Sequence, residues 1–243
     1  ISVGPPFYHK LIIPFLIPFL LIMAIGPKLK WIKSNLEDKI YLITLLVVSI
    51  LLSILIVKNF SSNFLINTIL ISSAFYLFFI TLRDFFIKGF KNLAQNIAHF
   101  GFSLLILSIL FNSLFSSEII TNLKVGQTFE NTKAKIVFES ISQKEAKNYR
   151  SIIGNFTVQD SKGKIENLSP ELRIYNQPNI TTSEADIKTT LLSDKFIVIN
   201  IVQNQEFFNV RYQVKPFMLW IWISVILISF GGLISFLKKG YEK

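Results

Sequence analysis

The sequence predicts a mainly α-helical membrane protein of about five transmembrane helices, with a small β-rich extracytoplasmic domain inserted between the fourth and the fifth. Of its 243 residues, 51% are hydrophobic and only 16% are charged, and the mean hydropathy is +0.50. The apolar residues form uninterrupted blocks, which a soluble domain would not tolerate. Between the last two blocks lies a polar stretch of about a hundred residues with short runs of period-two alternation.

The first 115 residues are expected to form a membrane domain of four helices. A helix needs ~20 mostly apolar residues to cross the hydrocarbon core. The prolines at positions 5 and 6 should keep the segment before the first helix extended. Residues 215–243 are expected to contain the fifth transmembrane helix and a cytoplasmic tail. The four expected helices of the first domain cover residues 7–25, 40–57, 63–82 and 96–115.

Residues 116–214 are expected to form the β-rich domain. Phe208, Val210 and Tyr212 alternate with polar neighbours, which is typical of a strand with one buried face. Asp160–Gly163 resembles a hairpin turn. About a hundred residues of short strands can form one small sandwich or barrel. Further strands are expected at residues 135–140, 151–159, 171–175 and 195–202.

The charges and the absence of cysteine exclude several functions. With no cysteine, the chain can carry no disulfide, no thiol exchange and no cysteine-ligated metal. Its net charge of +10 does not indicate nucleic-acid binding, because the basic residues of the short loops and the C-terminal tail lie mainly on one side of the predicted membrane. That side should be cytoplasmic, so the N-terminus and the β-domain should lie outside. The basic residues on it are Lys28, Lys30, Lys33, Lys39, Arg83, Lys88, Lys91, Lys238, Lys239 and Lys243, against Lys10 and Lys58 on the other side.

His99 is the leading candidate for a functional residue. It lies near one end of the fourth predicted span, and an ionisable or ligating side chain at membrane depth is costly to place. Imidazole is a common axial ligand of haem iron. A histidine that only hydrates a helix end would show the same spacing. Position alone therefore leaves both interpretations open.

The other histidine, His9, should lie on the opposite side of the membrane from His99. The apolar slab between the two sides is ~30 Å thick. Two imidazoles on one iron would lie only ~4 Å apart, twice the ~2 Å length of a metal–nitrogen bond. A second axial ligand is therefore expected from another polypeptide or from upstream sequence, since the chain begins with Ile1 and looks like part of a longer protein. Gly101, Gly231 and Gly232 lie in predicted spans and are interpreted as helix-packing sites.

An ordered series of motifs resembles the C-terminal portion of the CcmF family. The motifs are ISVGPPFY, AHFGFSLLILSI, NYRS, SPELRIY, TTSEADI and VKPFMLWIW followed by GGL, and together they run from Ile1 to the last span. The family contains the haem lyase subunits of the cytochrome c maturation system, in the bacterial inner membrane or the mitochondrial inner membrane of some plants and protists. The resemblance implies a multi-pass protein that works with the N-terminal part of CcmF, CcmH, holo-CcmE and apocytochrome c.

The resemblance also implies a cofactor and a set of candidate residues. AHFGFS matches the ligand-bearing helix of the family, which makes His99 an axial ligand of a buried haem b. The Trp-rich loop that holds the substrate haem in the family has no counterpart, so that site is not expected in this chain. No catalytic residue is assigned. Residues on matched motifs that could shape an outer docking face are Asn148, Tyr149, Pro170, Glu171, Arg173, Tyr175, Thr182, Glu184 and Lys215.

The sequence thus predicts the C-terminal part of a cytochrome c haem lyase, contributing a haem ligand and a docking domain. The alternative is a non-redox membrane receptor or assembly scaffold whose β-domain binds a partner. The docking residues have a structural alternative too, because they could simply hold the β-domain together. A transporter fragment is disfavoured, since no paired broken helices in two repeats are present.

Overall fold

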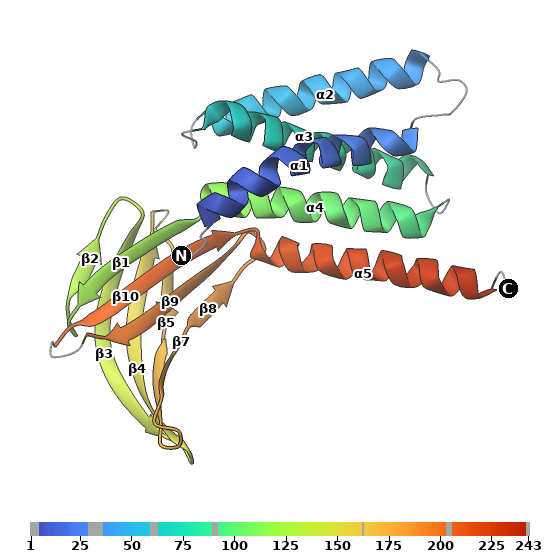
Figure 1. The fold of residues 1–243 in the computed structure, drawn as a ribbon. Helices are drawn as coiled ribbons and strands as arrows, with labels where there is room; N and C mark the ends of the chain where they lie inside the picture. The colour runs from blue at the N-terminus through green and yellow to red at the C-terminus, as the bar shows by residue number, and fades with distance from the viewer. Residues whose placement is uncertain are drawn as a thin grey trace. The chain divides into compact units, whose positions relative to one another are not determined.

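The computed structural model describes residues 5–28, 36–58, 63–88, 92–161, 163–202 and 206–241. The chain divides into two compact units, one formed by residues 1–115 and 220–243 and the other by residues 116–219. The first unit is helical and the second is built from strands (Figure 1). Each unit is described by itself.

The helical unit contains five long helices, all apolar and long enough to cross a membrane. The predicted fold class is therefore confirmed, because a strand-rich segment lies between the fourth and the fifth of these helices. The bounds are α1 (Pro5–Ile25), the short 3-10 helix η1 (Gly26–Lys28), α2 (Leu36–Val57), α3 (Phe64–Lys88), α4 (Leu93–Phe115) and α5 (Met218–Tyr241).

Two sequence-based expectations about helix ends are wrong. Helix α1 begins at Pro5, where an extended segment was expected. Proline is tolerated in the first helical turn because the N–H groups there have no intrahelical partner anyway. Helix α3 continues to Lys88, past the loop expected from Arg83 onward. The two charged residues at that point, Arg83 and Asp84, each have a partner, so the helix can continue past them.

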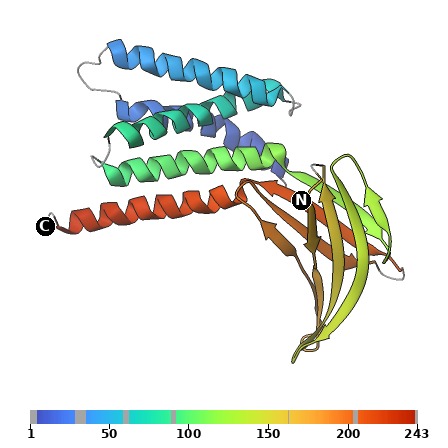
Figure 2. The same cartoon turned by 180° about the vertical axis from the view of Figure 1, so that it is seen from behind.

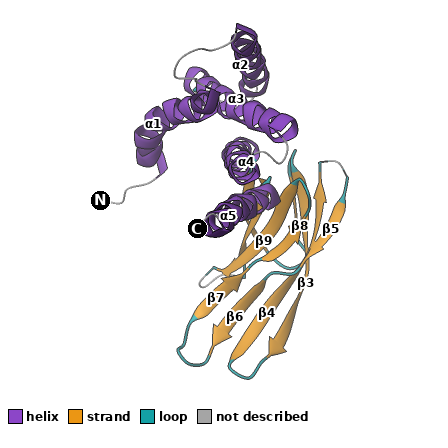
Figure 3. Cartoon of the chain, turned by 90° about the vertical axis from the view of Figure 1, so that its right-hand side faces the viewer, coloured by secondary structure: helices purple, strands orange, loops and turns teal. Residues whose placement is uncertain are grey.

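Helix α3 is the centre of the helical unit. It contacts α1, α2 and α4, and 61% of its apolar stretch is buried inside the unit, against 11% for α1 (Figure 3). Leu77 and Ala74 of α3 pack with Leu20 of α1 and Val57 of α2 in the core. The opposite faces of the outer helices expose large apolar side chains such as Phe15. Such a surface is stable in lipid and unfavourable in water.

Helices α4 and α5 lie side by side (Figure 2), and two glycines allow their close approach. A Cβ on Gly101 would lie 3.0 Å from the backbone nitrogen of Ile228. A Cβ on Gly231 would lie 2.8 Å from the carbonyl oxygen of Ala94. Small residues at such positions let membrane helices pack backbone to backbone. The packing role expected for Gly232 is not observed, because a Cβ there would meet no atom within 4 Å.

The second unit consists of two antiparallel sheets. Sheet A has the order β1-β10-β9-β8, and sheet B has the order β2-β3-β4-β6-β7 with β5 paired to β4. Sheet A comprises β1 (Ser117–Leu123), β8 (Asp186–Thr189), β9 (Ser193–Ile201) and β10 (Phe208–Pro216). Sheet B comprises β2 (Thr128–Glu130), β3 (Ala134–Glu145), β4 (Tyr149–Asp160), β5 (Ile165–Leu168), β6 (Glu171–Tyr175) and β7 (Thr181–Glu184).

The two sheets enclose one apolar core and are joined at one side by a strand that changes sheets. Residues 181–184 pair with β6, and after Ala185 the same extended chain pairs with β9. Strands that switch sheets in this way form the corners of sandwiches. Phe138 and Phe156 stack at the centre of the core, with ring centroids 4.3 Å apart. The predicted turn at Asp160–Gly163 is present, since the Gly163 N–H donates to the Asp160 carbonyl oxygen at 2.9 Å.

Candidate functional site

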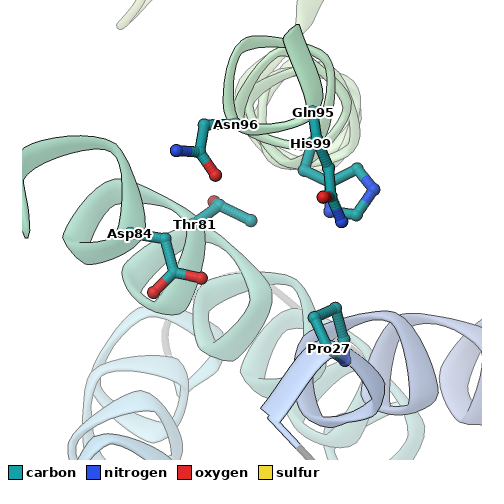
Figure 4. Close-up of a pocket in the computed structure, with 6 residues that line it drawn as sticks. All are labelled: Pro27, Thr81, Asp84, Gln95, Asn96 and His99. Carbon is teal, nitrogen blue, oxygen red and sulfur yellow. The ribbon is translucent and has the colours of Figure 1, made fainter. Parts of the chain in front are cut away.

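His99 lies in the second turn of α4 and faces a pocket formed by three parts of the helical unit. The pocket is lined by Pro27 of η1, by Thr81 and Asp84 of α3, and by Gln95, Asn96 and His99 of α4 (Figure 4). Gln95 and His99 are four residues apart, so they share one side of the helix. The C-terminal ends of α1 and α3 and the N-terminal end of α4 therefore meet around this imidazole.

The pocket is polar although it is built from apolar helices. Asn96 is buried, with 7% of the residue exposed, and Ser103 is buried one turn beyond His99. The hydroxyls of Thr81 and Ser103 are 2.8 Å apart and share a hydrogen bond that ties α3 to α4. Polar groups that cross between membrane helices hold a fixed geometry, because no water is available to replace a lost partner.

The charges beside the pocket are compensated. Asp84 forms an ion pair with Lys28, and both side chains are largely buried, at 14% and 16% exposure. One residue earlier on α3, the Arg83 guanidinium lies 3.7 Å from the ring centroid of Tyr41 on α2. A carboxylate without a partner would be costly at this depth. The pair therefore leaves the imidazole of His99 as the strongest metal-ligating group facing the pocket.

The residues present fit one side of a haem site but not an entire one. Imidazole on a rigid helix is suitable chemistry for an axial ligand. The enclosed space at the pocket is only about 20 Å³, close to the size needed for one water molecule. No group of three metal-ligating side chains occurs in the described part of the chain. A porphyrin bound to His99 would thus need a surface from another polypeptide segment to complete its site.

His99 is the pocket-lining residue that the sequence singles out, and its role as a ligand stays a prediction; the other lining residues were not predicted. Asp84 falls in an expected loop, although a carboxylate that follows Arg83 at the end of a long apolar run is itself a signal of a functional or paired group. Gln95 and Asn96, at four and three residues before His99, could also have been found by helical spacing. The backbone of His9 belongs to α1, and its side chain lies outside the described residues.

Six of the nine predicted docking residues lie together on the outer face of sheet B. Leu172 points into the core, so Glu171, Arg173 and Tyr175 point outward from β6. In register, Tyr175 pairs with Tyr149, Arg173 with Thr182, and Glu171 with Glu184. We call these residues the β6 face: Tyr149, Glu171, Arg173, Tyr175, Thr182 and Glu184.

Arg173 organises the β6 face. Its guanidinium lies 5.2 Å from the ring centroid of Tyr149, and its Nε donates to the Glu171 carboxylate at 3.1 Å. The rings of Tyr149 and Tyr175 are 5.3 Å apart. The hydrogen bond to Glu171 is the main cause that raises the pKa of Arg173 above its ordinary value. The face thus presents two aromatic rings around a fixed, permanently charged cation.

The other three predicted docking residues lie elsewhere in the β unit. Asn148 is in the β3–β4 turn beside Tyr149, where its carbonyl accepts from the Asn176 N–H at 3.2 Å. Pro170 is buried, and its carbonyl oxygen accepts from Gly154 at 3.0 Å, which is a structural role. Lys215 is on β10 of sheet A, paired in register with Asp194. The nine residues therefore do not form one surface.

The fold and the site together define a multi-pass membrane protein with a β-sandwich inserted before its last span. Residues 114–216 match the family model described as the CcmF C-terminal beta-sandwich. A Pseudomonas fluorescens protein named cytochrome c-type biogenesis protein CcmF is 26% identical over 257 residues, covering 100% of this chain and 39% of the relative. The Escherichia coli protein of the same name is 25% identical over 254 residues, with the same coverage.

A solved structure named Cytochrome c Heme Lyase CcmF has the same fold, with a TM-score of 0.72 and 17% sequence identity. The match covers 95% of this chain and 40% of that one. These findings confirm the resemblance inferred from the motifs: the chain is similar to the C-terminal portion of CcmF proteins. It spans about two fifths of the length of the curated relatives that it matches.

Proposed function

We propose that this chain is the C-terminal part of a cytochrome c haem lyase, in which His99 supplies one axial ligand of a haem b. The observation that carries the proposal is a histidine facing a polar pocket inside a membrane helix, in a chain similar over its whole length to CcmF proteins. When bound, haem iron supplies one-electron chemistry at a potential tuned by its ligands and surroundings. The chain's own residues would bind and orient the group.

The residues around His99 suit that role. Pro27 and Thr81 line the wall opposite the imidazole (Figure 4), and the hydrogen bond between Thr81 and Ser103 fixes α3 against α4. The Lys28–Asp84 ion pair would keep the Asp84 carboxylate from competing with the imidazole of His99 for a bound iron. The second axial ligand and the remaining porphyrin contacts would come from the N-terminal part of CcmF, because the pocket in this chain is too small to hold the group.

The test is the optical spectrum of membranes in which this chain is produced together with the N-terminal part of CcmF. The wild-type pair should show a b-type haem signal, and His99→Ala should abolish it. His9→Ala is the matched control, since it removes the only other imidazole of the chain and should leave the signal intact. In His99→Gly, added imidazole should restore part of the signal by entering the space left by the side chain.

Loss of the signal in His99→Ala without loss of the protein from the membrane would support the ligand assignment. An unchanged signal in His99→Ala would contradict it. A wild-type chain with no haem signal, but with a β unit that captures a partner, would instead favour the non-redox receptor.

We further propose that the β6 face is a docking face for apocytochrome c or for the partners CcmH and holo-CcmE. Two tyrosine rings beside an arginine are typical of contact residues at protein interfaces. Arg173→Glu should weaken holocytochrome formation strongly. Arg150→Glu on β4 is the matched control, because it changes the same charge at a neighbouring residue whose side chain alternates to the other face of the strand. Equal losses in the two variants would contradict this role.

The orientation expected from the loop charges belongs to the same proposal. The chain would cross the bacterial inner membrane with its N-terminus and β unit in the periplasm and its C-terminus in the cytoplasm. The pocket around His99 would then open near the cytoplasmic boundary. A tag after residue 243 that is reached from the periplasm would reverse this assignment.

A further inference from the structure

Two leucines at the tip of the β8–β9 hairpin are unusually exposed for a domain in water. Leu191 and Leu192 expose 69% and 67% of their surface. They occupy the central positions of the turn between β8 and β9. Exposed turns are normally built from glycine, asparagine, aspartate and serine, so adjacent leucines here require a reason.

The turn holds the two leucines outward in a fixed conformation. The Thr190 N–H donates to the Ser193 carbonyl oxygen at 3.0 Å, and the Thr190 hydroxyl donates to the same oxygen at 2.8 Å. The Ser193 N–H donates back to the Thr190 hydroxyl at 3.1 Å. Three hydrogen bonds between the residues that flank the leucines therefore close the turn, and the exposed side chains do not result from a loose loop.

The turn lies at the end of sheet A that is joined to the membrane. β1 begins at Ser117, two residues after α4 ends at Phe115, and β10 ends at Pro216, two residues before α5 begins. β1 and β10 are antiparallel neighbours, so both connections leave from the same end of the sheet. β9 pairs with β10 so that Ser193 faces Pro216, which brings the β8–β9 turn to that end as well (Figure 1).

A hydrogen bond fixes the turn to the connection with α5. The N–H of Phe217, the residue directly before α5, donates to the carbonyl oxygen of Leu192 at 2.9 Å. Trp220 and Trp222 follow in the first turns of α5, where such residues mark the membrane interface. Because Leu192 is hydrogen-bonded to Phe217, the turn lies beside the chain segment that continues into α5.

Two lysines lie near the leucines, at the ends of β8 and β10 that are close to the turn. Lys188 is exposed near the end of β8, and Lys215 is near the end of β10. A lysine can place its amine among lipid phosphates while a neighbouring apolar group enters the acyl region. Anionic lipid attracts such lysines further.

We propose that the β8–β9 turn is a membrane-inserting tip, in which Leu191 and Leu192 enter the bilayer that α5 crosses while Lys188 and Lys215 contact lipid headgroups. The tip would add a non-covalent anchor to the two covalent connections of sheet A. Three points of attachment, unlike two, would restrict tilting of the β unit against the membrane. This inference does not depend on haem binding.

The test uses the full chain in bilayer nanodiscs made of phosphatidylethanolamine and phosphatidylglycerol. Since the chain has no cysteine, Leu192→Cys can be labelled at one position with an environment-sensitive fluorophore. Val125→Cys is the matched control, because Val125 is an exposed aliphatic residue in the β1–β2 turn, at the opposite end of sheet A. Quenching by lipids with a nitroxide on the upper acyl chain reports contact with the bilayer.

We expect a blue-shifted emission and several-fold stronger quenching at position 192 than at position 125. Replacing phosphatidylglycerol with phosphatidylcholine should reduce the difference. Equal, weak quenching at both positions would overturn the proposal. A blue shift at position 192 without quenching by lipid would also overturn it, because the leucines would then be covered by protein.

Discussion

The helical unit and the β-sandwich each have an apolar core, but they differ in where they place small polar and large apolar side chains. In α2, Ser49 and Ser53 are completely buried, whereas Leu55 is 67% exposed. In the sandwich, Phe138 and Phe156 are buried and lysines and glutamates cover the surface. The difference follows from the two solvents. Lipid is as apolar as leucine, so helices in it are held by close packing and hydrogen bonds, while water drives apolar side chains inward.

Polar groups are satisfied differently in the two units. The Ser49 and Ser53 hydroxyls donate to carbonyl oxygens of their own helix, four residues earlier, at 2.7 Å. In the sandwich, the Lys195 amine joins Asp160 and Glu166 from the opposite sheet, each at 3.0 Å. Small hydroxyls add little bulk between helices, whereas a long lysine can link two sheets across a core.

The largest effect is expected from truncating a buried aromatic residue of the sandwich, compared with an exposed aromatic residue of the helical unit. Phe138→Ala should lower the free energy of unfolding by ~3–5 kcal/mol, because a buried ring is removed and a cavity is left. Phe15→Ala in α1, where the ring is 72% exposed, should change it by less than ~0.5 kcal/mol. Pulse proteolysis of the intact protein in detergent measures both. A large loss in Phe15→Ala would show that this surface packs against protein and not lipid.

The second effect concerns the ion pairs that link the two sheets. Lys195→Met should destabilise the protein by ~2–3 kcal/mol, because Asp160 and Glu166 would lose their shared cation while partly buried. Lys124→Met is the matched control, since its partner Glu206 is 85% exposed, and it should cause no measurable change. The same unfolding assay compares them. Equal stability of the two variants would mean that water screens the Lys195 cluster.

A smaller effect is expected at the contact between α4 and α5. Gly231→Ala should cost ~1–2 kcal/mol, because the new methyl group would meet backbone atoms of α4 and the helices would have to separate. Gly232→Ala adds the same methyl group into open space and should be neutral or slightly stabilising. Thermal unfolding in detergent, followed by circular dichroism, distinguishes the pair. Identical melting of the two variants would contradict close packing at Gly231.

The pH dependence of stability should be smallest near neutrality and should come from the sandwich. Burial raises the pKa of Tyr212 to about 12, so its stabilising contribution is complete below pH 10 and is lost as the pH rises toward 12. Burial alone would raise the pKa of Glu166, but hydrogen bonds from Lys164 and Lys195 lower it overall, so its contribution is lost only in acid. Tyr212→Phe should flatten the alkaline part of an unfolding profile. An unchanged profile in that variant would assign the alkaline transition to other groups.

Sequence patterns predicted five of the ten strands in the described residues. They missed β1, β2, β5, β7 and β8, although β1 buries Ile119 and Leu123 on one face. β3, β4, β6, β9 and β10 overlap the five expected strands. β7 and β8 were missed because the segment Thr181–Thr189 is polar and changes sheets at Ala185, which removes any continuous alternation. Sequence patterns also missed the pocket partners of His99. Asp84 becomes part of that site only because α3 continues past it and Lys28 pairs with it.

The sequence by itself determined the number of spans, the position of the β-domain, the candidate ligand His99 and the resemblance to CcmF proteins, because these depend on local composition and on ordered motifs. Only the tertiary structure decided which side chains surround the imidazole, which glycines bring helices together and which six residues share the β6 face. Such groupings depend on contacts between residues far apart in the chain. Local periodicity cannot specify them.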